Sequence, residues 1–269
     1  MKRLFKLGAM FDSIAGDFSS FDAYADNIRI AKDMGYEAIE LSLFYPLGYT
    51  TDQMNKFVQS IDMPIANFMT GLNAIRDNLW FSSPVKEVRD KAVERICTLI
   101  PYAKEMNATF VVGTMQGRGL EPDYQVGKAR VLECFKRIAE VAEKYNQTIV
   151  LEPMNFLECG YNFTLAEMME TIKAVGSSCY KPMLDTVHMN IEEADMISPF
   201  LRAGKDLGHV HLCETNFAMP GTGKMDYKLT FDALNAIGYD KYVTVKIARE
   251  PWPDGSRRSL EYLRSLGLV

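Results

Sequence analysis

Short apolar runs alternate along the chain with longer amphipathic stretches, and the alternation repeats roughly every thirty residues, the length of a strand followed by a helix. The strands predicted from these runs are Phe5–Met10, Ala38–Leu43, Pro64–Phe68, Thr109–Gly113, Thr148–Glu152, Lys181–Asp185, Leu207–Leu212 and Tyr242–Ile247. These are eight strands, the number found in a closed α/β barrel.

Between the strands lie segments with the apolar spacing of helices. The clearest of these are Asp22–Met34, Val85–Met106, Tyr124–Tyr145, Leu165–Val175, Leu229–Ile237 and Ser256–Leu266. No linker, low-complexity segment or block of charge separates the repeats, so the expected fold class is α/β, with residues 1–269 forming a single (β/α)8 TIM-barrel domain. A doubly wound parallel sheet is the alternative, but it does not usually need eight strands in this order.

Side chains capable of chemistry follow three consecutive predicted strands. The fifth strand ends at Glu152, the sixth at Asp185 with His188 three residues further, and the seventh carries His209 and His211. The carboxyl ends of parallel strands share one mouth and neighbouring strands lie about 5 Å apart, so Glu152, Asp185 and His211 are expected to converge. Two carboxylates and one imidazole suit a divalent ion such as Mn²⁺, Co²⁺ or Mg²⁺ better than an ion that prefers thiolates.

Each of these residues also has a purely structural interpretation. Taken alone, Glu152 could be a buried acid paired with a lysine, and Asp185 a capping residue followed by an interfacial histidine. His209 and His211 stand two apart on one face of a strand, so only one needs to be a ligand and the other is expected to be structural or supporting. Because three strand ends in register carry such residues, the sequence favours a site.

Composition and charge exclude several other classes of protein. The chain has 48% apolar and 24% charged residues, as soluble globular proteins do, and its net charge of −5 gives no reason to expect a nucleic-acid partner. The five cysteines lack CxxC spacing, which argues against a disulfide framework or zinc knuckle and fits a reducing cytoplasm. We find no export signal and no run of transmembrane length, so we expect a cytoplasmic protein with no membrane partner.

Five motifs carry a resemblance that extends over essentially the whole chain. They are Leu151-Glu152, Leu184-Asp185-Thr186-x-His188-Met189-Asn190-Ile191-Glu192-Glu193, His209-Val210-His211-Leu212-x-Glu214-Thr215-Asn216, Pro220-Gly221-x-Gly223 and Ile237-Gly238-Tyr239-Asp240. Together they resemble the xylose-isomerase-like TIM-barrel superfamily, and within it the ketose 3-epimerases of the D-tagatose and D-psicose (allulose) type. The segment from Asp185 to Glu193 is the most specific, whereas the first half contributes only general features such as Gly35–Glu40 on the second strand.

The resemblance implies a sugar isomerase or epimerase with a divalent metal, often Mn²⁺, held by Glu152, Asp185, His211 and a second glutamate on strand eight. The metal would bind the carbonyl oxygen and a neighbouring hydroxyl of an open-chain sugar and stabilise an enediolate. Glu152 would take the proton from the adjacent carbon, and the glutamate on strand eight would return a proton on the opposite face. Proteins resembling this family commonly form homo-oligomers, so a dimer or tetramer is expected.

Substrate contacts are expected from side chains near the mouth of the barrel. The residues predicted to bind the sugar substrate are His188, Glu158 and Trp80. Aromatic residues after the first three strands, namely Phe11, Phe44, Tyr45, Trp80 and Phe81, could form an apolar wall or lid over the mouth, or could pack against a partner subunit.

Two positions depart from the family pattern. Lys246 stands on the eighth strand where the second glutamate is expected, and Phe217 stands where ketose epimerases usually carry an arginine that reaches the substrate. Glu250 lies four residues beyond Lys246 and would have to fold back to replace the missing ligand.

The lysine changes the expected electrostatics, because an ammonium about 4 Å from a divalent ion is repelled by several kcal/mol even at an effective dielectric constant of about 20. Lys246 could be neutral and act as a ligand or catalytic base, or it could swing aside and leave a three-ligand metal with water in the fourth position. Alternatively its ammonium could replace the metal and pair with Glu152 and Asp185. A Schiff base with a ketose carbonyl is a further option, although nothing else in the sequence supports it.

Two classes of function follow from this sequence. The first is a metal-assisted epimerase or isomerase that acts on a ketose or related carbonyl sugar, with Glu152 and Lys246 as the catalytic residues. A lyase on an oxidised sugar and an apurinic-site endonuclease are weaker enzymatic alternatives, the latter because of the negative charge and the three histidines. The second class is a metal-free or non-catalytic sugar-binding relative in which Lys246 has ended the metal chemistry.

Overall fold

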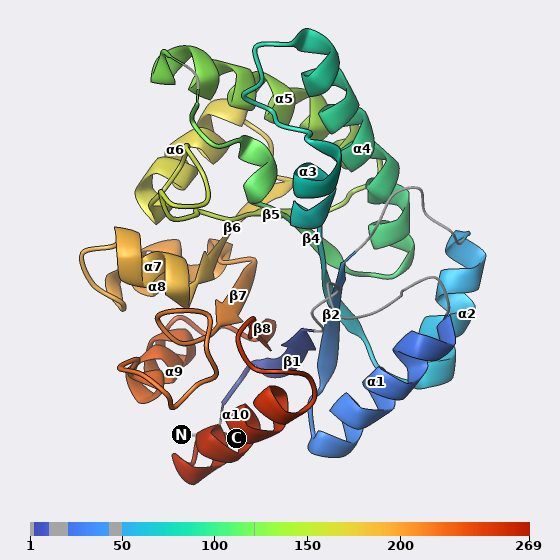
Figure 1. The fold of residues 1–269 in the computed structure, drawn as a ribbon, viewed down its shortest axis with the longest axis vertical. Helices are drawn as coiled ribbons and strands as arrows, with labels where there is room; N and C mark the ends of the chain where they lie inside the picture. The colour runs from blue at the N-terminus through green and yellow to red at the C-terminus, as the bar shows by residue number, and fades with distance from the viewer. Residues whose placement is uncertain (1–2, 11–20, 43–49, 121) are drawn as a thin grey trace. The chain divides into compact units, whose positions relative to one another are not determined.

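The computed structural model describes residues 3–10, 21–42, 50–120 and 122–269, and these residues form eight strands and ten α-helices. The strands are β1 (Lys6–Met10), β2 (Ala38–Ser42), β3 (Ile65–Met69), β4 (Thr109–Val112), β5 (Ile149–Leu151), β6 (Tyr180–Asp185), β7 (His209–Leu212) and β8 (Tyr242–Val245). They follow one another in chain order in a closed barrel, in which β1 pairs in parallel with both β2 and β8 (Figure 1). The (β/α)8 barrel predicted from the sequence is therefore confirmed.

The α-helices lie in the connections between these strands. They are α1 (Phe21–Met34), α2 (Thr51–Ile61), α3 (Gly71–Asp77), α4 (Lys86–Glu105), α5 (Tyr124–Lys144), α6 (Leu165–Val175), α7 (Thr186–Glu192), α8 (Ser198–Ala203), α9 (Tyr227–Ala236) and α10 (Asp254–Ser265). All six predicted helices are present, with boundaries shifted by no more than about two residues, as is usual at helix ends.

Four helices, α2, α3, α7 and α8, were not predicted from the sequence. Helices α3, α7 and α8 have six or seven residues, about two turns or less, so an apolar period has no room to repeat within them. The 11 residues of α2 do show the helical spacing of apolar residues, at Met54, Phe57, Val58 and Ile61, so the sequence does carry a signal for this helix.

The chain divides into two compact units. The first comprises Met1–Leu41, Lys56–Ala66 and Met183–Val269, and the second comprises Ser42–Asn55 and Asn67–Pro182. The divisions fall inside β2, α2, β3 and β6, so these four elements contribute residues to both units. The organisation of residues 1–269 as one domain stays a prediction.

Buried aromatic rings join helices to neighbouring segments within each unit. In the first unit, Phe5 packs edge-on against Phe231 of α9, with ring centroids 4.9 Å apart, and the ring of Tyr239 lies 6.4 Å from Phe5. In the second unit, Phe135 of α5 lies 5.6 Å from the rings of both Phe81 and Tyr180. Such rings bury large apolar areas, and the pairs Phe5–Phe231 and Phe81–Phe135 are edge-to-face, so they stabilise the attachment of α9 and α5.

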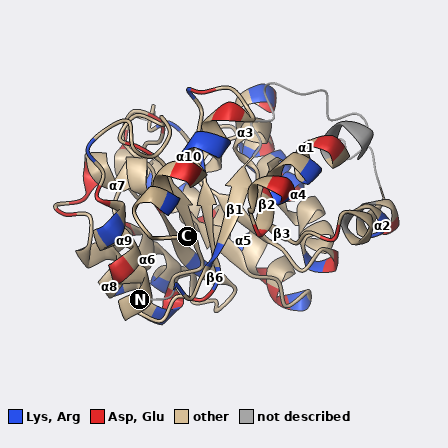
Figure 2. Ribbon diagram, turned by 90° about the horizontal axis from the view of Figure 1, so that it is seen from below, with Lys and Arg blue, Asp and Glu red and all other residues tan. Residues whose placement is uncertain are grey.

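Charged residues of both signs are mixed along the helices, as Figure 2 shows. Several opposite charges lie one turn apart in the same helix, for example Lys86 and Asp90 in α4, whose side chains are 2.6 Å apart. Exposed pairs of this kind contribute little to stability. Among the helices described, none combines the length and the apolar character needed to cross a bilayer.

Candidate functional site

The first functional residue stands where β6 turns directly into α7. Asp185 is the last residue of β6, and its Oδ1 atom accepts a hydrogen bond of 2.9 Å from the backbone N–H of Val187. An aspartate in this position satisfies one of the N–H groups that the first turn of a helix leaves unpaired. The thiol of Cys213 also donates to Oδ1, at 3.3 Å. The helix cap therefore fixes the carboxylate so that its second oxygen, Oδ2, faces other side chains.

Three nitrogen atoms surround Oδ2 of Asp185. Nζ of Lys246 lies 2.8 Å away, Nδ1 of His211 lies 3.4 Å away and Nε2 of His188 lies 3.9 Å away. The side chain of Asp185 is fully buried, whereas 16% of the Lys246 side chain is exposed. Burial alone would raise the pKa of Asp185, but the Lys246 ammonium and the histidines outweigh it and hold this pKa well below its ordinary value. Asp185 is therefore an ionised carboxylate with a cation bound to Oδ2.

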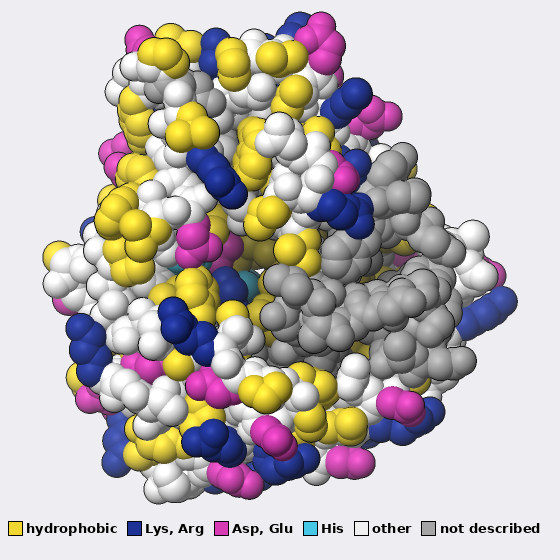
Figure 3. All heavy atoms as spheres, viewed as in Figure 1, with side chains coloured by type: hydrophobic (Ala, Val, Ile, Leu, Met, Phe, Trp, Pro, Cys, Tyr) yellow, Lys and Arg dark blue, Asp and Glu magenta, His cyan; other side chains and the backbone are white. Residues whose placement is uncertain are grey.

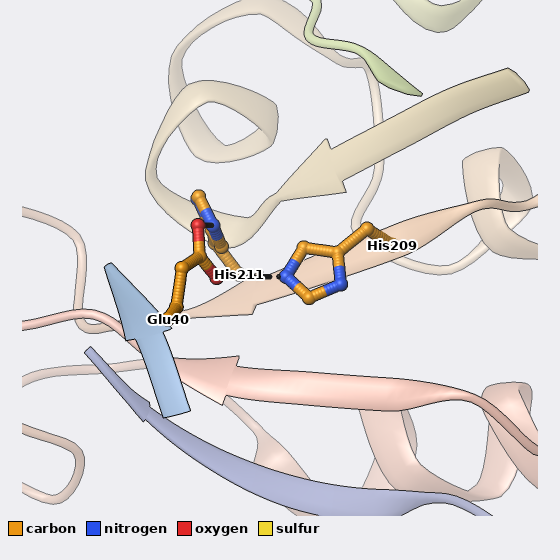
Figure 4. A group of neighbouring side chains, drawn as sticks. All are labelled: Glu40, His209 and His211. Carbon is orange, nitrogen blue, oxygen red and sulfur yellow. Dashed lines mark hydrogen bonds and ion pairs between the residues drawn. The ribbon is translucent and has the colours of Figure 1, made fainter. Parts of the chain in front are cut away.

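A second buried carboxylate, Glu40 of β2, holds both histidines of β7 (Figure 4). Its Oε2 lies 2.9 Å from Nε2 of His209, and its Oε1 lies 2.8 Å from Nε2 of His211. Burial alone would raise the pKa of Glu40, but His211 and His209 keep it well below its ordinary value. An ionised carboxylate only accepts hydrogen bonds, so Nε2 of each histidine carries a hydrogen. His211 therefore lies between two carboxylates, with Nε2 on Glu40 and Nδ1 3.4 Å from Oδ2 of Asp185.

The barrel register explains why these side chains meet. Asp185 pairs with His211 across β6 and β7, and His211 pairs with Thr244 across β7 and β8. Lys246 stands two residues beyond Thr244, and residues two apart along an extended strand point to the same face. Neighbouring strand ends therefore deliver a carboxylate, an imidazole and an ammonium to one place, as the sequence predicted for Asp185 and His211.

The aromatic ring of Phe217 covers Lys246 and His188. Nζ of Lys246 lies 5.2 Å from the centroid of this ring, within the range of a cation–π interaction, and the His188 ring meets it edge-on at 5.9 Å. Phe217 has a φ of 62°, which is uncommon for a residue with a large side chain. Its carbonyl accepts from the backbone N–H of Ala248 at 3.0 Å. The loop after β7 is thus fastened to the segment after β8, with Phe217 against Lys246.

Two nearby glutamates serve structural roles. Oε1 of Glu214 accepts backbone hydrogen bonds from Lys224 and Met225, both at 3.0 Å, so this residue shapes the segment that contains Pro220–Gly223. Oε2 of Glu250 accepts from the backbone N–H of Met219 at 3.0 Å. Glu250 therefore has a defined partner in the loop after β7 and does not replace the glutamate that Lys246 displaced.

Glu152 follows β5 in the second unit and is 5% exposed. The carboxylate lies over Gly113, because a Cβ atom built on this glycine would stand 2.6 Å from Oε2 of Glu152 and 2.7 Å from Sδ of Met154. The backbone carbonyl of Glu152 accepts from the side-chain amide of Gln116 at 3.1 Å. Asn162 in turn donates to Gln116 at 2.7 Å. A buried amide network therefore positions this residue, and its convergence with Asp185 and His211 stays a prediction.

Trp80 and Glu158 also belong to the second unit. Trp80 is half-buried, its indole N–H donates to Asn78 at 2.6 Å, and the Arg118 guanidinium stacks over its ring at 5.5 Å. These residues line a cavity together with Ile75, Ser82, Ser83, Pro84 and Leu120. Glu158 is half-buried and accepts from the side-chain amide of Asn155 at 3.0 Å. Substrate contacts by Trp80, Glu158 and His188 stay predictions.

The expected aromatic wall is only partly described. Phe81 is fully buried and packs on Phe135, so it belongs to the core of the second unit and does not line the mouth. Phe11, Phe44 and Tyr45 lie outside the residues that the structure describes.

Three residues that support the site were not given a role from the sequence. Glu40 was visible as one acidic residue within an apolar strand, but its partners in β7 lie 169 and 171 positions away. Gly113 looked like the ordinary end of a strand, and Thr244, whose Oγ1 lies 3.2 Å from Nε2 of His209, looked like an ordinary strand residue. Only the closed barrel shows what these residues contact.

Buried carboxylates and histidines of the kind that bind divalent metals are therefore present. The ligand atoms of Glu40, His209 and His211 all lie within 4.8 Å of one another. Each histidine in this group has its own carboxylate oxygen at the distance of an N–H···O hydrogen bond.

Residues 28–266 match the protein family described as "Xylose isomerase-like TIM barrel". Among curated relatives, the L-ribulose 3-epimerase of Mesorhizobium japonicum is 29% identical over 211 residues, which cover 77% of this chain and 70% of the relative. The fructoselysine 3-epimerase of Shigella flexneri is 24% identical over 253 residues, which cover 88% of this chain and 91% of the relative.

Solved structures show the same fold. A structure of an L-ribulose 3-epimerase superposes with a TM-score of 0.84 at 24% identity, covering 98% of this chain and 94% of the other. The 3-keto-D-glucoside 4-epimerase YcjR from E. coli superposes with a TM-score of 0.82 at 21% identity, covering 97% of this chain and 99% of the other.

Proposed function

We propose that this chain, which belongs to the xylose isomerase-like TIM-barrel family, is an epimerase that inverts the carbon next to the carbonyl group of a ketose. Relatives in different organisms are named ketose, L-ribulose and fructoselysine 3-epimerases, which supports this reaction class. The observation that carries the proposal is the meeting of Asp185, His188, His211 and Lys246 at neighbouring strand ends, where barrels of this type place their chemistry.

The reaction class follows from the acidity of the carbon to be inverted. A hydrogen on a carbon beside a carbonyl leaves as a proton when the resulting enediolate oxygen is stabilised by a positive charge or hydrogen-bond donors. Returning a proton to the opposite face of that carbon inverts the centre. The site therefore needs a base, an acid on the other face and a cation near the oxygen.

The divalent ion expected from the sequence does not fit these residues while Lys246 is protonated. Asp185 Oδ2, the oxygen that would bind the ion, already carries the ammonium at 2.8 Å. A divalent ion about 4 Å from an ammonium would be repelled by about 8 kcal/mol at an effective dielectric constant of about 20. Mn²⁺, Co²⁺ and Mg²⁺ are subject to the same repulsion, so we assign no step to a metal.

We assign the proton transfers to Glu152 and Lys246. Glu152 accepts the proton from the substrate carbon, and the Lys246 ammonium donates a proton to the other face of that carbon. Both groups exchange protons with solvent before the next turnover. His188, Glu158 and Trp80 are the side chains proposed to bind the sugar, through hydrogen bonds from the first two and ring stacking on the third.

Exposed apolar side chains in the second unit support our proposal of a homo-oligomer. The exposed fractions are 84% for Leu120, 72% for Leu157 and 62% for Phe156. Figure 3 shows hydrophobic side chains at the surface of the face viewed there. Apolar side chains of this size on a surface are typical of protein contacts, and light scattering on the purified protein tests the dimer or tetramer.

A non-catalytic sugar-binding protein is the second candidate, and the observation that favours it is the pairing of Lys246 with Asp185 where the family resemblance implies a glutamate. Hydrogen exchange at the substrate carbon separates the two candidates. The protein is incubated in D2O with D-psicose, D-tagatose, L-ribulose and fructoselysine, and each mixture is followed by proton NMR.

The epimerase proposal predicts loss of the C3 proton signal and appearance of the C3 epimer for at least one sugar. Glu152→Gln should lower the exchange rate by a factor of about 100 or more, as expected when a general base is removed. Binding of a sugar without any exchange would instead support the non-catalytic candidate.

A further inference from the structure

We propose that the Lys246 ammonium is the resident cation of this site, that Phe217 completes its binding place, and that the protein consequently works without a divalent metal. The inference rests on the proposed function and extends it. The contacts that define the binding site for the ammonium all lie within the first unit.

One buried carboxylate oxygen accepts a hydrogen bond from the ammonium. Oδ2 of Asp185 lies 2.8 Å from Nζ of Lys246, while Oδ1 is engaged by the backbone of α7. Nδ1 of His211 lies 3.4 Å from the same oxygen, and Nε2 of His211 lies 2.8 Å from Oε1 of Glu40. A carboxylate as deeply buried as Asp185 needs a positive charge beside it, and the Lys246 ammonium supplies one.

The ring of Phe217 forms another side of the binding site for the ammonium. Its centroid lies 5.2 Å from Nζ, and the negative face of an aromatic ring attracts a cation. An arginine at position 217 would instead bring a second positive charge toward Lys246. The two departures from the family pattern are therefore compatible with each other. Lysine in place of glutamate at position 246 introduces a fixed positive charge. Phenylalanine in place of arginine at position 217 removes the positive charge that would repel it.

Backbone contacts hold the two residues in register. The N–H of Lys246 donates to the carbonyl of Leu212 at 3.0 Å, which extends the ladder between β7 and β8, and the N–H of Ala248 donates to the carbonyl of Phe217 at 3.0 Å. These two hydrogen bonds fix Phe217 opposite Lys246. Glu250, the nearest glutamate that follows β8, accepts from Met219 and does not enter the arrangement.

An ammonium in this position serves the chemistry differently from a metal ion. It brings one positive charge and N–H donors, so it can hydrogen-bond to the developing enediolate oxygen without giving up its contact with Asp185. The nitrogen forms no covalent bond with the substrate, and after it donates its proton to the carbon it regains one from solvent and is again an ammonium. The site should therefore tolerate chelators and gain nothing from added Mn²⁺.

Metal binding by the whole protein tests the inference without reference to activity. Protein purified without chelator is examined by elemental analysis and by thermal melting with and without Mn²⁺, alongside Lys246→Glu, Lys246→Met and the pair Lys246→Glu with Phe217→Arg. We expect the native protein to hold less than one metal ion in ten chains and to melt at the same temperature with Mn²⁺.

Lys246→Glu should bind about one Mn²⁺ per chain and melt about 5 °C higher when Mn²⁺ exceeds its Kd by about 100-fold. Lys246→Met removes the charge without adding a ligand, so it separates the effect of losing the ammonium from the effect of gaining a carboxylate. It also provides a variant without the ammonium if Lys246→Glu does not fold. Stoichiometric metal in the native protein, or a clear rise in its melting temperature with Mn²⁺, overturns the inference. Absence of activity would leave this result intact and count against the proposed function instead.

Discussion

Nζ of Lys246 lies 2.8 Å from Oδ2 of Asp185, where Asp185 ends β6 and Lys246 directly follows β8, two strands separated by β7 in the barrel. Asp185 is fully buried and caps α7 with its other oxygen, so one carboxylate supports both the local fold and the charge arrangement of the site. The Asp185–Lys246 pair is therefore expected to affect both the stability of the fold and the activity of the site. Unfolding experiments measure the first and rate measurements the second.

Removing the cation should destabilise the protein. Lys246→Met leaves the Asp185 carboxylate buried without its ammonium, which is expected to lower the free energy of unfolding by about 3–5 kcal/mol. Asp185→Asn keeps an oxygen for the α7 cap, because asparagine is as good a capping residue as aspartate. The double variant should lose less than the sum of the single losses, since it contains neither buried charge.

Urea unfolding of the four proteins at neutral pH gives this double-mutant cycle. A coupling energy above about 1 kcal/mol between positions 185 and 246 supports the ion pair. Strictly additive losses would mean that the two side chains do not stabilise each other.

The hydrogen bonds of Glu40 predict the protonation of His211. Because the carboxylate can only accept, we expect 15N NMR of the imidazoles to show the hydrogen of neutral His211 on Nε2 and the lone pair on Nδ1. Glu40→Gln should weaken this preference and slow the proposed reaction by about 10-fold or more, as losses of groups that orient a histidine often do. A neutral His211 with its hydrogen on Nδ1 and none on Nε2 would contradict the hydrogen bond to Glu40.

Because Gly113 has no side chain, the Glu152 carboxylate can lie directly against its backbone, and we predict that this position tolerates no larger residue. A Cβ atom there would stand 2.6 Å from Oε2 of Glu152, so Gly113→Ala should displace the carboxylate and lower kcat by about 100-fold with a smaller change in KM. Gly176→Ala is the matched control, because this glycine caps α6 and has no atom within 4 Å of its added Cβ. Equal losses of kcat in both variants would attribute the effect to stability alone.

Two buried thiols predict a loss of stability in alkali. Burial raises the pKa of Cys134 and of Cys159 from 9.0 to about 12. Below pH 9 both thiols are neutral in the folded and unfolded chains; above it the unfolded chain releases protons that the folded chain keeps, so stability falls from about pH 9 to about pH 12. Unfolding in urea between pH 8 and pH 10 should show a shallower decline for Cys159→Ala. An unchanged slope would show that this thiol does not titrate as expected.

The barrel could be predicted from the sequence because its signals are local. Apolar runs of four to six residues mark the strands, and Thr164, Glu167 and Gly176 form the start and stop signals that α6 uses in the structure. Asp185 and His211 were recognised as a pair because the carboxyl ends of consecutive strands are neighbours in any such barrel, and their register confirms it.

The remainder of the site depends on contacts that no local pattern encodes. Glu40 meets His209 and His211 only because closure of the barrel brings buried side chains of β2 and β7 together. The sequence shows that Lys246 departs from the family pattern, but it does not show whether the ammonium binds Asp185 or extends into solvent. That contact, and the contact of the ammonium with the Phe217 ring, depend on side-chain geometry. Sequence motifs therefore identified which residues matter, and the fold showed how they interact.

The measurement that tests the central claim most directly is proton exchange at C3 of a ketose in D2O, followed by NMR in the presence of excess EDTA. We predict that the native protein exchanges the C3 proton and forms the C3 epimer at the same rate with and without the chelator, and that Lys246→Met reduces both rates together. Absence of exchange across D-psicose, D-tagatose, L-ribulose and fructoselysine would contradict the epimerase proposal, and exchange that EDTA abolishes would contradict the role of Lys246 as the resident cation.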